Sequence, residues 1–157
     1  MKLIMQDELE RKRYEALLEI EGIGKETARQ LIIRLPMLGY IDRKVVASYA
    51  GLAPYSRSSS GKEYSRHLRM GNTRIRAALY LCAVSAFRFK EGVLHDYKER
   101  LQNRKNDGSN LKELSNKAIV IRMAHKLLDI ANAVMREVVM QHQLQQDIKA
   151  NTRKEVA

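Results

Sequence analysis

Apolar residues recur every three or four positions in two long stretches, and this spacing constrains the fold more than any other feature. In residues 73–88 they are Ile75, Ala78, Leu79, Cys82 and Ala86, and in residues 116–142 they are Ile119, Met123, Leu127, Ile130, Val134 and Val138. Such spacing places the side chains on one face of an α-helix. The chain holds only two prolines, so long helices can form without interruption. We predict an all-α fold.

Shorter helical patterns fill most of the remaining chain. We expect helices over residues 5–19, 26–35, 43–50 and 93 to about 103. Asp42, Asn72 and Ser115 are placed to cap the starts of helices, and Gly51 is placed to stop one. At 157 residues the chain is predicted to form one domain that buries roughly 70% of its unfolded surface. Within it, residues 14–35 form a helix-hairpin-helix, 36–142 a small helical bundle that carries a serine loop, and 143–157 a polar tail that frays.

Residues 56–71 interrupt the helical patterns with a run of serines and basic side chains that has almost no aliphatic residue. A polar stretch of this length inside a compact domain is typical of a functional loop or of disorder. Gly51-Leu52-Ala53-Pro54 leads into it as a tight turn, and the predicted cap Asn72 leads out. We therefore expect a serine-bearing loop held between two helices, either irregular or a short β-hairpin that turns at Ser60-Gly61.

The segment Ile20-Glu21-Gly22-Ile23-Gly24-Lys25 lies between the first two predicted helices and is typical of a helix-hairpin-helix. Gly22 and Gly24 allow the chain to turn and let backbone N–H groups approach a phosphate at the start of the second helix. Lys25 adds a positive charge there. An ordinary helical hairpin with a glycine turn is the alternative.

The net charge of +11, with a pI of about 9.9, favours a polyanionic partner. A solvated basic surface is the alternative, but the cations gather around the serine loop and could stabilise a phosphate: Arg57, Lys62, Arg66, His67, Arg69, Arg74 and Arg76. A single cysteine excludes an internal disulfide and is typical of the cytoplasm. Scattered histidines and single carboxylates predict no metal site in this chain. The longest apolar run, 77–87, is short of the roughly 20 residues of a membrane span, so we expect no membrane partner.

Several of these segments, taken in chain order, resemble the sequence pattern of a known protein family. They are Ile20-Glu21-Gly22-Ile23-Gly24, Tyr49-Ala50-Gly51-Leu52-Ala53-Pro54, Ser60-Gly61, and Gly71-Asn72 with Arg76 and Leu79. Together they resemble the C-terminal domain of the insertion sequence 110/116/902 family of transposases, a group that includes the Piv-type invertases. Residues 117–128 (KAIVIRMAHKLL) are similar to the family's closing helix. The resemblance covers about residues 14–130.

The resemblance implies a DNA recombinase with two catalytic parts. In the family, an N-terminal RuvC-like domain binds Mg²⁺ through four acidic residues, and the C-terminal domain supplies a serine nucleophile. Carried onto this chain, the nucleophile is Ser60, with Ser59 as the runner-up. The DNA-binding residues are Gly22, Gly24, Lys25, Arg57, Lys62, Arg66, Arg69, Arg74 and Arg76. The resemblance also implies a homo-oligomer in the full-length form, a structured guide RNA in some members, and a bacterial cytoplasm with its nucleoid as the location.

Two departures from the family pattern leave alternatives open. No acidic, strand-rich segment precedes the helix-hairpin-helix, and the family's Lys-Arg before Gly-Asn is Arg69-Met70 here. The sequence therefore predicts a DNA-binding, serine-bearing transposase portion that does not recombine DNA alone. A non-catalytic helix-hairpin-helix protein that binds nucleic acid and an inactive transposase remnant are the alternatives.

Overall fold

The structure is a computed structural model, and it describes residues 7–53, 58–59, 62–63, 71–103 and 114–155. The described residues form six helices and two strands of two residues each. In chain order they are α1 (Glu8–Leu18), α2 (Lys25–Arg34), α3 (Arg43–Tyr49), β1 (Ser58–Ser59), β2 (Lys62–Glu63), α4 (Thr73–Ala86), α5 (Val93–Gln102) and α6 (Asn116–Glu155). The predicted all-α class is confirmed.

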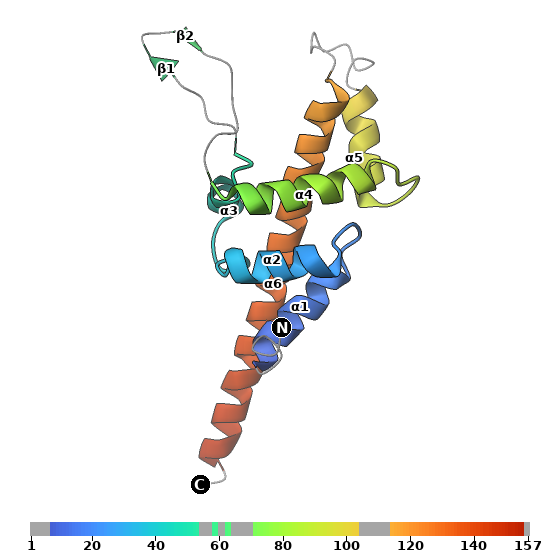
Figure 1. The fold of residues 1–157 in the computed structure, drawn as a ribbon. Coiled ribbons are helices and arrows are strands. Elements are labelled where there is room, and N and C mark those ends of the chain that lie inside the picture. The colour runs from blue at the N-terminus through green and yellow to red at the C-terminus, as the bar shows by residue number, and fades with distance from the viewer. Residues whose placement is uncertain (1–6, 54–57, 60–61, 64–70, 104–113, 156–157) are drawn as a thin grey trace.

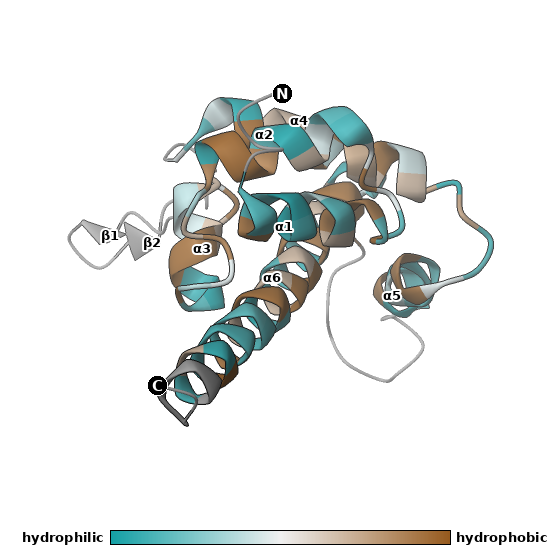
Figure 2. Cartoon of the chain, turned by 90° about the horizontal axis from the view of Figure 1, so that it is seen from below, coloured by the Kyte–Doolittle hydropathy of each residue, from teal (hydrophilic) through white to brown (hydrophobic). Residues whose placement is uncertain are grey.

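Helix α6 is the longest of the described helices, and α1, α3, α4 and α5 pack along it (Figure 1), whereas α2 packs on α1 and α4. Helices α4 and α1 make the most extensive contacts with α6, and α5 and α3 also lie against it. The apolar faces meet in one hydrophobic cluster, to which Leu17, Leu79 and Leu127 contribute fully buried side chains. Figure 2 shows hydrophobic and hydrophilic residues interspersed along the helices, most visibly along α6. No helix in the described ranges is long and apolar enough to cross a membrane.

The buried face of α6 is wider than the predicted stripe. Ile119, Met123 and Leu127 are buried as expected, whereas Ile130, Val134 and Val138 are half-buried. The face also includes residues outside the stripe: Val120, Ala124, Leu128, Ala131, Met135 and Val139. The reason is tertiary, because several helices cover α6 along its length, and a helix covered from more than one direction buries more than a single stripe.

The predicted helix ends are largely confirmed by hydrogen bonds. The side chain of Asp42 accepts from the N–H of Lys44 at 2.8 Å, and that of Asn72 accepts from the N–H of Arg74 at 3.1 Å. Ser115 Oγ accepts from the N–H of Ala118 at 3.3 Å. Gly51 follows α3 with a φ of +72°, which glycine adopts without steric cost. Asp7, which the sequence analysis did not single out, caps α1.

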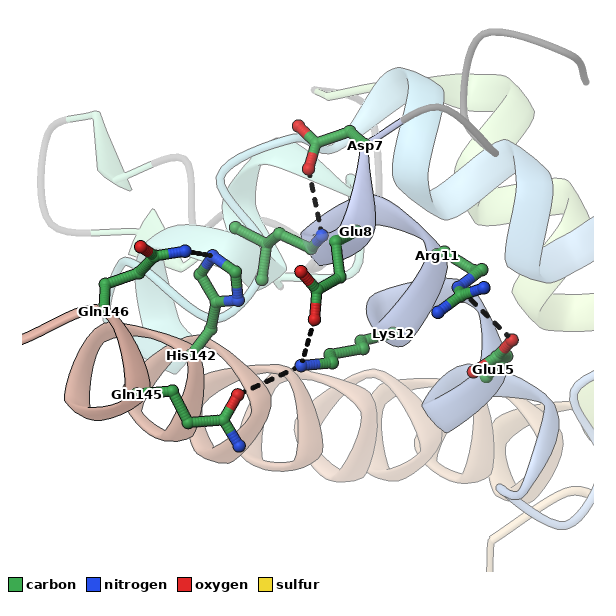
Figure 3. A network of polar contacts seen from close by, with 9 residues as sticks. Asp7, Glu8, Arg11, Lys12, Glu15, His142, Gln145 and Gln146 are labelled. Atoms are coloured by element: carbon green, nitrogen blue, oxygen red, sulfur yellow. Dashed lines mark hydrogen bonds and ion pairs between the residues drawn. The ribbon is translucent and has the colours of Figure 1, made fainter. Parts of the chain in front are cut away.

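The expected end of the last helix near His142 is wrong, whereas the fraying of residues 143–157 stays a prediction. The helix continues to Glu155. Residues 143–155 contain no proline or glycine and include three Gln, two Lys and one Arg, which favour helix. Figure 3 shows how α1 contacts this extension: Lys12 Nζ lies 2.9 Å from Glu8 Oε1 and donates to Gln145 Oε1 at 3.1 Å.

Two buried polar side chains hold the connector between α2 and α3 against the bundle. Arg13 donates to the carbonyl oxygens of Pro36 at 3.0 Å and Leu38 at 2.9 Å. Asn132 Oδ1 accepts from the N–H of Gly39 at 2.7 Å, and Asn132 Nδ2 donates to Ile41 O at 3.2 Å. These bonds satisfy backbone groups that would otherwise be buried without partners.

Candidate nucleic-acid interface

The residues that flank the serine stretch meet at one place, which we call the neck (residues 48–53 and 71–76). The N–H of Asn72 donates to Tyr49 O at 2.7 Å, and this bond joins the end of α3 to the start of α4. Arg76 Nη1 donates to Gly51 O at 3.3 Å. Gly71 has a φ of +87°, and a Cβ atom added there would lie 2.6 Å from Ser48 O. The described segments on the two sides of the serine stretch are thereby brought together.

Strands β1 and β2 lie beyond the neck (Figure 1) and pair in antiparallel register. Ser58 pairs with Glu63, and Ser59 pairs with Lys62. The two residues between the strands, Ser60 and Gly61, lie outside the described residues, as do Arg57, Arg66 and Arg69. Their predicted roles therefore stay predictions.

The first turn of α4 carries Arg74 and Arg76 next to the neck. The side chain of Asn72 caps the backbone N–H of Arg74. The Arg74 side chain is exposed, so its guanidinium is available to a ligand beside the neck. Arg76 is half-buried and bonded to Gly51, so it contributes to the neck itself. The structure thus adds a positioning role for Arg76 to its predicted DNA contact.

The glycine segment between α1 and α2 forms a tight turn. Gly22 has a φ of +91°, and the N–H of Ile23 donates to Ile20 O at 3.0 Å. Gly24 is the N-cap of α2 without a side-chain cap bond, and an added Cβ atom would meet nothing within 4 Å. Gly24 and Lys25 are both exposed. Uncapped N–H groups at an exposed helix start suit an anion.

Glu26 puts a carboxylate into the same first turn of α2. Hydrogen bonds from Arg29 and then from Gln30 lower the pKa of Glu26 from 4.5 to about 2. Its Oε1 lies 2.7 Å from Arg29 Nη2. The carboxylate is therefore ionised at neutral pH and paired with a cation on its own helix, which offsets its repulsion of a phosphate.

The two groups of predicted DNA-binding residues lie at opposite ends of a helical pair. Helices α2 and α4 run antiparallel in Figure 1, and Thr27 Oγ1 lies 3.2 Å from Cys82 Sγ. A Cβ atom added to Gly22 would lie 3.7 Å from Ala86 Cβ, at the end of α4 far from the neck. The 14 residues of α4 span about 20 Å. Arg74 and Lys25 therefore lie at two separate places, about one helix length apart.

A cluster of cations between α3 and α6 was not singled out from the sequence. Arg43, Lys126 and Arg136 line a cavity of about 410 Å³, and Arg43 and Lys44 line a second cavity of about 370 Å³. In the sequence each of these residues is typical of an ordinary solvated helix face. Because α3 and α6 are distant in the chain, nothing in the sequence indicates that their cations lie together. Only their packing brings them together.

No metal site is formed by the side chains in the described ranges. No group of three or more His, Cys, Asp or Glu residues there could hold a metal ion. Cys82 is a buried free thiol. The described residues do not fit Mg²⁺.

A known protein family matches this chain. The sequence model described as the Transposase IS116/IS110/IS902 family matches residues 14–99, which is more than half of the chain. The chain belongs to this transposase family. The match includes the glycine turn, the whole neck and the serine stretch, so this transposase domain has a role in DNA transposition. A comparison with curated proteins gives no match. The similarity of residues 117–128 to the family's closing helix lies outside the matched range.

Proposed function

We propose that the chain is the DNA-binding, serine-bearing C-terminal portion of an insertion-sequence transposase. The observation that carries the proposal is the neck. The family's Tyr49–Ala53 and Gly71-Asn72 segments meet there through the Asn72–Tyr49 bond and the close approach of Gly71 to Gly51. This junction holds both ends of the serine stretch beside the exposed Arg74.

In the proposed reaction Ser60 Oγ attacks a DNA phosphodiester. An O–P bond forms to the serine, one P–O bond to a deoxyribose breaks, and the released sugar oxygen takes up a proton. The phosphoserine link conserves the energy of the broken bond for rejoining. Arg74 lies where it can stabilise charge on a phosphate near the neck. Activation of the serine is assigned to a separate RuvC-like domain, which would carry the Mg²⁺ that the described residues do not fit.

The remaining partners belong to the same proposal. A homo-oligomer and a structured guide RNA would complete the assembly, in the bacterial cytoplasm. The exposed start of α2 supports one DNA phosphate contact at Gly24 and Lys25. That same feature also favours the second candidate, a non-catalytic helix-hairpin-helix protein that binds nucleic acid.

A covalent-trapping experiment tests the serine assignment and separates the two candidates. Single alanine variants of Ser58, Ser59 and Ser60 are compared on a nicked suicide substrate with the RuvC-like domain supplied in trans or by fusion. We expect Ser60→Ala alone to abolish the protein–DNA adduct, with folding and DNA affinity nearly unchanged.

Adduct formation by Ser60→Ala, with loss in Ser59→Ala, would move the nucleophile to Ser59. Normal recombination by all three variants would exclude the serine mechanism. DNA binding without any adduct from the wild-type chain would favour the non-catalytic protein.

A further inference from the structure

The two cavities between α3 and α6 form one basic groove, lined on its cationic side by Arg43, Lys44, Lys126 and Arg136. Arg43 and Asp129 line both cavities, so the cavities adjoin. The groove is formed by packing, since its cationic residues come from two helices that end and begin 67 positions apart in the chain, at Tyr49 and Asn116.

Three of these cations have no partner in the part of the chain that the structure describes. Neither a hydrogen bond nor an ion pair involves the side chain of Arg43, Lys44 or Lys126 there. Arg136 uses one donor, Nη2, on Ile41 O at 3.1 Å. Cations that are gathered in a concave site and unpaired create a positive potential that attracts an anion.

Two carboxylates also line the groove, and both have other partners. Asp42 caps α3 through the N–H of Lys44 at 2.8 Å. Asp129 Oδ2 lies 3.5 Å from His125 Nδ1, while Asp129 Oδ1 is buried without a hydrogen-bond partner. With four cations against two carboxylates, the net charge of the groove stays positive without any contribution from His125.

The groove begins at the neck. Ala47 and Ala53 line its second cavity, and the carbonyl oxygen of Ala47 accepts the N–H groups of Leu52 and Ala53, at 2.9 and 3.1 Å. From there the lining residues follow α6 from His125 to Arg136. A DNA backbone held at the neck would therefore lie next to the second cavity of the groove.

We propose that the groove between α3 and α6 binds the sugar-phosphate backbone of duplex DNA, as a second contact beside the neck. This proposal rests on the proposed function, because the DNA must first be held at the serine stretch. Arg43 and Lys126 each neutralise one phosphate. The contact fixes the path of the duplex away from Ser60 and carries no base readout.

The test measures duplex DNA affinity of the 157-residue chain across a salt series. The groove variant is Arg43→Gln with Lys126→Gln. The matched control is Arg100→Gln with Lys149→Gln, which removes the same charges from exposed positions on α5 and on the distal part of α6. The slope of the logarithm of the binding constant against the logarithm of the salt concentration is expected to be about −4 to −5 for the wild-type chain. In the groove variant this slope should be about 2 units shallower, and DNA binding should be about 30-fold weaker at about 0.1 M salt. The control should retain most of the slope.

A third variant, Asp129→Asn, tests the sign of the effect. Removing this negative charge should tighten DNA binding by roughly threefold. Weaker binding by this variant, or equal losses in the groove variant and the control, would overturn the proposal. A loss confined to duplex RNA of the same sequence would overturn it in favour of an RNA contact. A wild-type slope near zero would instead reject the DNA-binding function itself, so the two failures are distinguishable.

Discussion

At the scale of single residues, Gly71 is the clearest link between the family motif and the physical structure. Its φ of +87° is strained for any other residue. The space where a Cβ atom would lie is filled by Gly51 and by Ser48 O. The Gly-Asn and Gly-Leu segments are therefore complementary halves of one close backbone contact. Asn72 then caps α4 with its side chain and bonds Tyr49 O with its backbone.

Substitution of Gly71 by alanine should destabilise the neck. We expect a loss of about 2–3 kcal/mol, from backbone strain and overpacking together. Gly24→Ala is the matched control: its φ is −89° and the space beside it is open, so it should lose less than about 1 kcal/mol. Urea unfolding followed by circular dichroism measures both. Equal stabilities of the two variants would show that the neck contact is not tight.

At the scale of elements, α6 divides into a packed part and an extension. Its last buried side chain is Val139, at 6% exposure. Beyond it Met140, Leu144 and Ile148 are 55–65% exposed, so the extension adds little apolar burial to this fold. The hydrogen bond from Lys12 to Gln145 is exposed and long-range in sequence, and such a contact contributes little to stability.

Two truncations of α6 should behave differently. A chain that ends at residue 142 should keep its fold and lose no more than about 3 °C in Tm. A chain that ends at residue 131 loses Met135 and Val139 from the core and the buried bonds of Asn132. Together these losses are about 5–8 kcal/mol, comparable with the whole stability of a small domain. Thermal melts measure both chains, and a cooperative melt of the shorter one would contradict this division.

At the scale of the whole molecule, the positive charge is divided among separate surfaces. The start of α2, the neck and the groove beside α3 each carry exposed cations. The antiparallel packing of α2 on α4 keeps the first two about one helix length apart. A net charge of +11 also favours unfolding in acid, because protonated carboxylates leave the cations uncompensated.

Acid should therefore weaken the fold through Glu26. Because its pKa is lowered in the folded chain, its contribution to stability is present above pH 4.5, falls as the pH drops toward about 2, and is gone below that. The urea midpoints of the wild-type chain and Glu26→Gln should differ at neutral pH and converge across this window. A constant difference would contradict the prediction.

Local features of the sequence predicted the helices and most of their ends. Asp42, Asn72 and Ser115 act on backbone N–H groups two or three residues away, so their roles are readable without knowledge of the fold. The apolar spacing of α4 likewise predicted the burial of Ile75, Leu79, Cys82 and Ala86, although Ala78 is half-buried and the buried Ala83 was not predicted. The end of α6 was misplaced because polarity was taken as a sign of fraying, although polar residues such as Gln and Lys sustain a helix.

What the sequence determined by itself is the helical class, the caps and the ordered glycine segments that mark the transposase family. Tertiary structure alone decided that Gly71 packs on Gly51, that Asn132 holds Gly39, and that Arg43 meets Lys126 across a groove. The physical reason is the separation along the chain between the residues that interact. Caps and turns depend on neighbours within one helical turn, whereas a groove or a close backbone contact depends on how distant helices cross.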